Sequence, residues 1–200
     1  DLGIRALTTE NIEQLMDQVV REITFTLDAD YCKVLEYQPN NHCLLLKAGT
    51  GWLQGLVGSA TVPDDANSQA GFTLSNGQPV ITEDLRSEKR FKGPKLLTDH
   101  RVVSGISCVI ENGDHPYGVL GVHTKTKRKF TRDDASFLVS AANILSVAIH
   151  RKTTEVRLRE NEKRLRIAKD SNNMGSFEFY TASGETHWDN VIKEIWGIDK

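Results

Sequence analysis

Residues 117–134, YGVLGVHTKTKRKFTRDD, join a strand pattern directly to the start of a helix. Side chains of a strand alternate between its two faces, so Val119, Gly121 and His123 share one face. Thr131 can cap a helix that begins after it, and the two aspartates that follow favour the N-terminal end of the helix dipole. The stretch therefore predicts the last strand of a sheet, a short basic loop and a long helix.

The chain before this stretch contains two pairs of neighbouring strand patterns. The run 102–110 precedes it across the turn ENGDHP, and the runs 31–38 and 42–50 are separated by little more than PNN. Each pair predicts an antiparallel hairpin, which favours an α+β fold with helices on the faces of a central antiparallel sheet. The other expected elements are a helix over 9–27 with Thr8 or Thr9 as N-cap, a short helix from about Asp65 to Gly77, a short strand in 80–84 and a weak helix in 85–101.

Four glycines lie within the ten residues 49–58, directly after a predicted strand. A dinucleotide-binding loop would need a third glycine where this chain has Gln54, and no glycine pair has the spacing and following lysine of a Walker loop. The residues that follow are β-branched and start a helix poorly. We therefore interpret the glycines as turn residues that permit a positive φ angle.

The composition is that of an ordinary globular chain, with 38% hydrophobic and 26% charged residues among 200. A formal net charge of −2 gives no general attraction to nucleic acid or to an acidic membrane surface. No apolar run is long enough for a transmembrane helix. The three cysteines form no ligand cluster, so the sequence predicts no metal site and no catalytic group, and it favours a cytoplasmic location.

The helix expected after Thr131 continues to about Asp170 without proline or glycine, a length of about 60 Å. Its first half is apolar enough to pack on the sheet, whereas its second half is highly charged. Leu158 and Leu165 fall at one position of a heptad frame in which half of the seam residues are polar. We expect a parallel two-stranded coiled coil between identical chains. The alternative is a single solvated helix, supported by Glu–Arg pairs four residues apart.

Together these segments resemble the GAF domains of bacterial sensor proteins. The resemblance covers about residues 5–150 and rests on AGTGWLQGLVGSATVP and on the segment from SGISCVI through FTRDD. The charged helix is similar to the signalling helices that join sensor modules. The residues that match the GAF pattern most specifically are Gly118, Leu120, Gly121, Val122, His123, Phe130, Thr131 and Asp134.

The end of the chain, residues 165–198, resembles the first third of a PAS domain. The sequence alternates and turns at Ser183–Gly184, which predicts a hairpin, and NVIKEIWGI then predicts a short helix. The resemblances imply a GAF sensory domain over residues 1–150, a signalling-helix linker over 151–170 and a PAS fragment over 171–200. The residues matching the PAS pattern are Met174, Gly175, Phe177, Gly184, Trp188 and Gly197.

The GAF resemblance implies that the glycine segment leads into loops above a small-molecule pocket, with Trp52, Cys108 and His123 as candidate ligand contacts. It implies a module that relays small-molecule binding or a partner contact, through a dimeric helix, to a downstream output domain in cis. The parent protein would be a bacterial sensor histidine kinase or diguanylate cyclase. The residues expected at the homodimer interface are Leu15, Val19, Leu145, Leu158 and Leu165.

The GAF subfamilies leave the cofactor open. Bilin-binding members carry a cysteine at a position that corresponds to the neighbourhood of Lys92, where this chain has none, which argues against a covalently bound bilin. Members that bind cyclic nucleotides carry an N-K pair that is missing here. One branch, the free methionine sulfoxide reductases, uses pocket cysteines, but Cys32 and Cys43 flank a hairpin instead. We expect no enzymatic activity of this chain, and the alternative function is a ligand-free dimerisation and spacer module.

Overall fold

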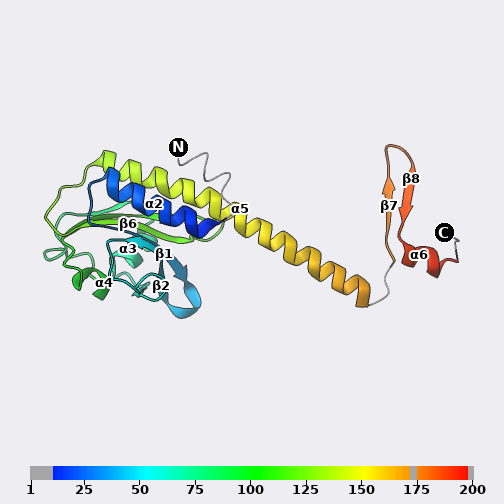
Figure 1. Cartoon of the computed structure of the whole chain (residues 1–200), viewed down its shortest axis with the longest axis horizontal. Coiled ribbons are helices and arrows are strands. Elements are labelled where there is room, and N and C mark those ends of the chain that lie inside the picture. The colour runs from blue at the N-terminus through cyan, green and yellow to red at the C-terminus, as the bar shows by residue number, and fades with distance from the viewer. Residues whose placement is uncertain (1–10, 172–174, 198–200) are drawn as a thin grey trace. The chain divides into compact units, whose positions relative to one another are not determined.

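The computed structural model describes residues 11–171 and 175–197. The described chain divides into two compact units, residues 1–152 and 153–200. Figure 1 shows the first unit as a sheet with helices on both of its faces. No helix in the described ranges is both long enough and apolar enough to cross a membrane.

The sheet of the first unit has six strands in the order β3-β2-β1-β6-β5-β4, all of them antiparallel to their neighbours. The two predicted hairpins are confirmed, and β1 pairs with β6 to join them at the centre of the sheet. The sheet is covered on both faces, so β1 and β6 are buried along most of their length. The strands are β1 (Tyr31–Gln38), β2 (Cys43–Thr50), β3 (Thr61–Pro63), β4 (Val80–Thr82), β5 (Ser104–Ile110) and β6 (Gly118–Thr124).

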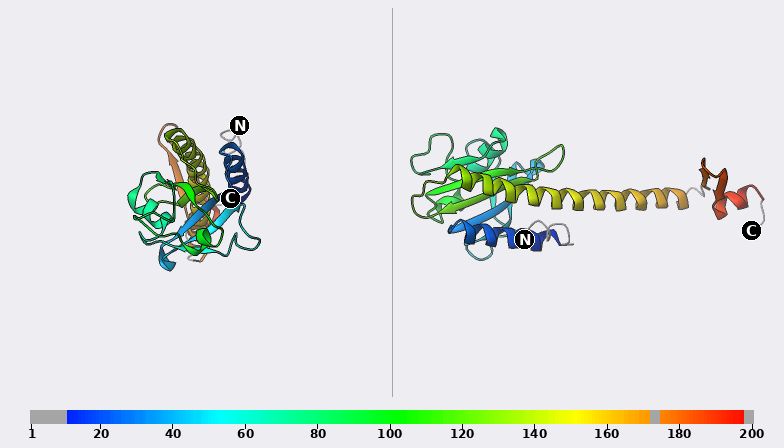
Figure 2. Two further views of the ribbon diagram at one scale, coloured as in Figure 1. Left: turned by 90° about the vertical axis from the view of Figure 1, so that its left-hand side faces the viewer. Right: turned by 90° about the horizontal axis from the view of Figure 1, so that it is seen from above.

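One face of the sheet is covered by two helices that lie side by side, α2 (Ile12–Thr26) and α5 (Arg132–Ser171) (Figure 2). The main hydrophobic core lies between them and the sheet, where the buried stripe of α2 meets the apolar first half of α5. Burial of these side chains is the principal stabilisation of the unit. The core residues from the strands include Cys32, Val34, Ile106, Cys108, Leu120 and Val122.

The opposite face is covered by long connections and two short helices, α3 (Gln69–Asn76) and α4 (Lys95–Thr98). A second core with Leu35, Leu46 and Val119 lies beneath them. The short helix was predicted to start near Asp65, but it begins after Ser68, whose hydroxyl oxygen accepts a hydrogen bond from the Gly71 amide at 2.9 Å. Strand β3 was not predicted.

The helix ends are set by side-chain caps. The N-cap of α2 is Asn11, which accepts hydrogen bonds from the amides of Glu13 and Gln14. The predicted caps Thr8 and Thr9 lie outside the described residues, and the helix starts after them because Asn11 satisfies its free amides. At α5 the prediction is confirmed: the Asp134 amide donates to the Thr131 hydroxyl at 3.1 Å, and an Asp134 carboxylate oxygen accepts from the Thr131 amide at 2.7 Å.

The second unit holds the predicted hairpin and short helix. Strands β7 (Phe177–Tyr180) and β8 (Glu185–Trp188) pair antiparallel across a turn in which Gly184 has a φ of +74°. Asp189 caps α6 (Asn190–Ile195), where it accepts from the Ile192 amide. Of the residues that carry the PAS resemblance, Met174 lies outside the described residues.

Candidate functional site

A pair of buried basic side chains lies on the face of the sheet that the loops cover. Lys33 of β1 and His123 of β6 are fully buried, and within the described chain neither the Lys33 ammonium nor either ring nitrogen of His123 has a hydrogen-bond partner. In the sheet, Lys33 pairs with Gly121 and Tyr31 pairs with His123, so the two residues are diagonal neighbours. Orphaned polar atoms at this depth are uncommon in proteins and point to a missing partner.

Glycines make the space for these two side chains. A Cβ atom on Gly121 would lie 3.1 Å from Nε2 of His123 and 3.3 Å from Cε of Lys33, so both side chains lie over this glycine. A Cβ on Gly105, the β5 partner of His123, would overlap the imidazole ring itself. The small residues of β5 and β6 therefore allow a lysine and a histidine to lie flat on the sheet.

Aromatic rings enclose the pair from one side. The Trp52 ring stacks on Tyr31 with 4.6 Å between centroids, and it lies 6.2 Å from the ring of His123 and 5.8 Å from the Lys33 ammonium. The indole N–H donates to the Cys32 carbonyl at 2.8 Å, which fixes the ring over Gly49. Trp52 thus holds the glycine-rich segment against the sheet.

His100 completes the aromatic group, and its hydrogen bonds define its tautomer. Its Nε2 accepts a hydrogen bond from the Leu53 amide at 3.1 Å, so the neutral ring carries its proton on Nδ1 and donates it to the Leu96 carbonyl at 2.8 Å. Through these two hydrogen bonds, the His100 side chain links α4 to the glycine-rich segment. His100 is therefore occupied structurally, unlike His123.

Helix α3 adds further polar groups above the same row of the sheet. Ser107 of β5 pairs with Gly121, and its hydroxyl lies 2.8 Å from that of Thr73 on α3. Gln69, one turn earlier in α3, is buried, and its amide nitrogen has no hydrogen-bond partner within the described chain. Gln69 is therefore a further unpartnered polar group on the helix that covers this face.

Burial controls the charge of the two basic groups. Loss of solvent lowers the pKa of Lys33 from its ordinary value of 10.5 to about 7. The pKa of His123 is held well below its ordinary value, first by burial and then by repulsion from Lys33. His123 is therefore neutral, and Lys33 can gain or lose a proton near neutral pH.

The structure brings two of the three predicted ligand contacts together. Trp52 and His123 are neighbours, whereas Cys108 lies on the other face of the sheet, in the core beneath α2 and α5. Cys108 pairs with Leu120, whose side chain points away from the His123 face, and burial raises the pKa of the thiol to about 12. The structure therefore places Cys108 away from Lys33, His123 and Trp52.

Sequence reasoning missed Lys33. In YCKVLEYQ a lysine two residues from Tyr31 and Leu35 shares their inward face, and this alternation was the available signal.

The residues predicted at a homodimer interface divide into two groups. Leu15, Val19 and Leu145 are buried in the core of the first unit, so the expectation that they contact a second chain is corrected: they pack within their own chain. Leu158 and Leu165, on the second half of α5, are 60% and 72% exposed. Only these two remain available for a contact between chains.

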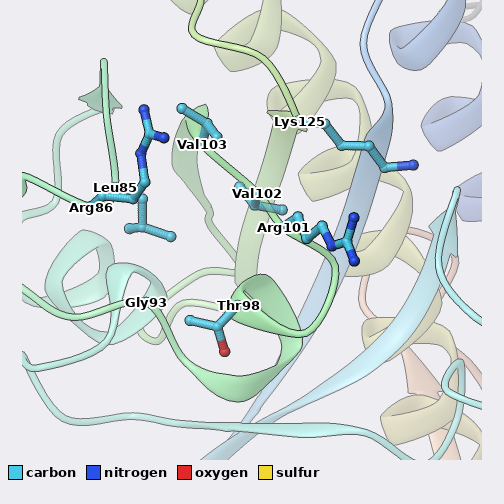
Figure 3. A pocket seen from close by; sticks show the side chains of 8 residues that line it. All are labelled: Leu85, Arg86, Gly93, Thr98, Arg101, Val102, Val103 and Lys125. Carbon is cyan, nitrogen blue, oxygen red and sulfur yellow. The ribbon is translucent and has the colours of Figure 1, made fainter.

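A separate pocket of about 500 Å³ opens at the end of β5 and β6, next to α4 (Figure 3). Figure 3 shows Leu85 and Arg86 on one side of it and Arg101 and Lys125 on the other. Neither Lys33 nor His123 lines this pocket. The lining residues are Leu85, Arg86, Gly93, Thr98, Arg101, Val102, Val103 and Lys125. In the described part of the chain no group of histidine, cysteine and acidic residues could hold a metal ion.

Comparisons with known proteins give one family and many similar folds. The profile of the GAF domain matches residues 11–149, which is more than half of the chain. No curated protein sequence matches. The GAF domain of a phosphoenolpyruvate-protein phosphotransferase from Coxiella burnetii superposes with a TM-score of 0.70 at 18% identity, covering 78% of this chain and 92% of that one.

Two further similar structures have other activities. A free methionine-R-sulfoxide reductase from Neisseria meningitidis, in complex with its substrate, has a TM-score of 0.67 at 14% identity, over 77% of this chain and 87% of that one. The blue-light absorbing form of the PixJ GAF domain from Thermosynechococcus elongatus has a TM-score of 0.62 at 14% identity, over 78% of this chain and 94% of that one. At these identities the likeness concerns the fold.

Proposed function

The chain belongs to the GAF family, and we propose that its first unit is a sensory module that binds a small molecule on the loop-covered face of its sheet. GAF folds are known as ligand-binding modules of signalling proteins, which supports this class of function. The ligand site is the region around Lys33, His123 and Trp52. In this reading the unit is regulatory and carries out no chemistry of its own.

The observation that carries the proposal is the unpartnered polar pair at the centre of the sheet. An isolated buried ammonium destabilises the folded state unless something pairs with it. Lys33 and His123 have no hydrogen-bond partner among the described residues, although both are fully buried. A bound molecule with polar atoms would pair with Lys33 and His123, and it would lie against the Trp52 ring.

The same strands provide a route from the site to α5. Lys33 and His123 point to the ligand face, while their chain neighbours Cys32 and Val122 point into the core beneath α2 and α5. A ligand that shifts β1 against β6 therefore moves the surface on which α5 packs. Such a shift passes a signal only to the extent that the ligand prefers one arrangement of the helix.

The second half of α5 would carry the signal in a homodimer. Leu158 and Leu165 lie seven residues apart and expose apolar side chains on a highly charged stretch of the helix, as in a sparse coiled-coil seam. The PAS resemblance of residues 171–200 supports a multidomain bacterial sensor, with an output domain in cis such as a histidine kinase or diguanylate cyclase. We propose the same cytoplasmic setting for this chain.

Two of the three cysteines are poorly suited to thiol chemistry like that of the structurally similar reductases. Cys32 and Cys108 are buried, and burial raises the pKa of both thiols, which disfavours the reactive thiolate. A covalent bilin would need a cysteine near Lys92, and Phe91, Gly93 and Pro94 surround that position instead. Both points favour non-covalent sensing.

Native mass spectrometry of the freshly purified chain, followed by thermal shift against a metabolite panel, tests the proposal. We expect a bound or stabilising small molecule, with stabilisation of about 2.7 kcal/mol at a concentration of 100 Kd. Lys33→Met should remove that effect, whereas Lys163→Gln on the exposed part of α5 should retain it. Equal stabilisation of both variants would place the ligand away from Lys33 and contradict the proposed site, and no ligand in either assay would favour the ligand-free spacer module.

A further inference from the structure

We propose that the pocket lined by Arg101, Lys125 and Val102 is a second binding site, specific for an organic anion that has an apolar body. This pocket is distinct from the Lys33–His123 region, since Lys33, His123 and Trp52 are not among its lining residues. Its volume of about 500 Å³ falls within the range of small-molecule sites.

The charge of the lining residues selects an anion. Three of the eight lining side chains are cationic and none is acidic. Arg86 is partly neutralised, since its guanidinium donates two hydrogen bonds to the Asp84 carboxylate, at 2.8 and 2.7 Å. Arg101 has no hydrogen bond or ion pair to a described side chain, and the Lys125 ammonium lies 5.1 Å from the Tyr31 ring without a carboxylate partner in the described chain. Two cationic groups are thus available to a ligand.

The backbone at Arg101 supports a role for its side chain. Arg101 has a φ of +56°, a conformation that favours glycine and that few residues with long side chains adopt. The turn is held by hydrogen bonds from the Arg101 amide to the Thr98 carbonyl and from the Val102 amide to the Leu97 carbonyl, both at 3.0 Å. Glycine would fit this turn with less strain, so the arginine is explained by what its guanidinium does in the pocket.

Apolar side chains form the rest of the pocket. Leu85, Val102 and Val103 line it, and Val102 belongs to a small buried cluster with Tyr31 and Leu97. A ligand that is only a small inorganic anion would leave this surface without contact. An aromatic or aliphatic body with one acidic group would use the apolar lining and the two available cations together.

Fluorescence titration with 8-anilinonaphthalene-1-sulfonate, an aromatic anion, tests the site on the full chain, and neutral N-phenyl-1-naphthylamine serves as the uncharged counterpart. We expect Arg101→Gly and Lys125→Gln each to weaken binding of the sulfonate about 3- to 10-fold, because each removes one charge-assisted contact. The Arg101→Gly chain should melt at the same temperature or higher, since glycine relieves the positive φ. Lys163→Gln, which removes a cation from the exposed part of α5, is the matched control.

Each possible result either supports or contradicts the second binding site. Weaker sulfonate binding in both pocket variants, with wild-type affinity in the control and little change for the neutral dye, supports the site. Equal losses for the two dyes would show apolar binding without charge selection and would overturn the proposal. So would unchanged sulfonate affinity in both pocket variants. Loss of sulfonate binding in Lys33→Met alone would place the anion in the interior region and would also contradict the second site.

Discussion

Replacing Lys33 by methionine should change how the stability of the first unit depends on pH. Methionine keeps the length of the side chain and removes the ammonium. In the wild-type chain the pKa of Lys33 falls from 10.5 in the unfolded state to about 7 in the folded state. Between these values the unfolded chain binds more protons, so stability rises with pH across this window.

The size of the effect follows from the two pKa values. A difference of 3.5 units corresponds to about 5 kcal/mol of destabilisation when the pH is well below 7. About 2 kcal/mol of this should be regained between pH 7 and pH 9, with the rest regained above pH 9. The measurement should stay within this window, because protonation of unfolded His123 below pH 7 adds an effect in the same direction as Lys33, and ionisation of unfolded Cys32 above pH 9 acts in the opposite direction.

Urea denaturation followed by far-UV circular dichroism gives the free energy of unfolding at pH 7, 8 and 9. The informative quantity is the difference between wild type and Lys33→Met at each pH, because titration of all other groups largely cancels. We expect the variant to be more stable at pH 7 and its advantage to shrink by about 2 kcal/mol at pH 9. An advantage that does not change with pH would refute the burial of an unpaired ammonium.

Three further predictions concern the sheet, the cap of α5 and the proposed dimer. Gly118→Ala should lower the free energy of unfolding by more than about 2 kcal/mol in urea denaturation, because its Cβ would overlap the Leu35 carbonyl in the paired strand. Thr131→Ala should lower it by about 1 kcal/mol through loss of the α5 cap, whereas Thr131→Ser should retain wild-type stability. The double variant Leu158→Asp with Leu165→Asp should weaken the proposed dimer in analytical ultracentrifugation, and an unchanged dimer affinity would contradict the coiled coil.

Much of the fold could be predicted because local patterns determine it. The period of two in β6 assigned His123 and Gly121 to one face, and the structure confirms that face as the one that carries the polar site. The hairpins were predictable because each joins strands adjacent in sequence. The glycine interpretation is also confirmed, since Gly51, Gly55 and Gly58 have positive φ angles.

The rest of the site depends on contacts that sequence does not encode locally. Cys108 was assigned to the pocket because the register between β5 and β6 was unknown, and that register sets which face each side chain occupies. Lys33 was missed because a charged residue in a strand usually points to solvent, whereas both faces of β1 are covered here. The burial of Leu15, Val19 and Leu145 likewise follows from the packing of α2 beside α5 on one sheet.

The energetic cost of burying the Lys33 ammonium also sets an upper limit on the free energy by which a ligand there could be coupled to α5. Without an anionic partner, Lys33 destabilises the fold by up to about 5 kcal/mol, and pairing recovers part of this only if the bound arrangement keeps the pair together. Coupling between sites in proteins is typically about 1–3 kcal/mol, so the electrostatic term at Lys33 is large enough to supply it. Because Cys32, the neighbour of Lys33, packs in the core beneath α5, the recovered energy arises one residue away from the surface that positions the helix. A ligand that binds without contacting Lys33 would not gain this electrostatic stabilisation, and it should occupy the site without moving α5.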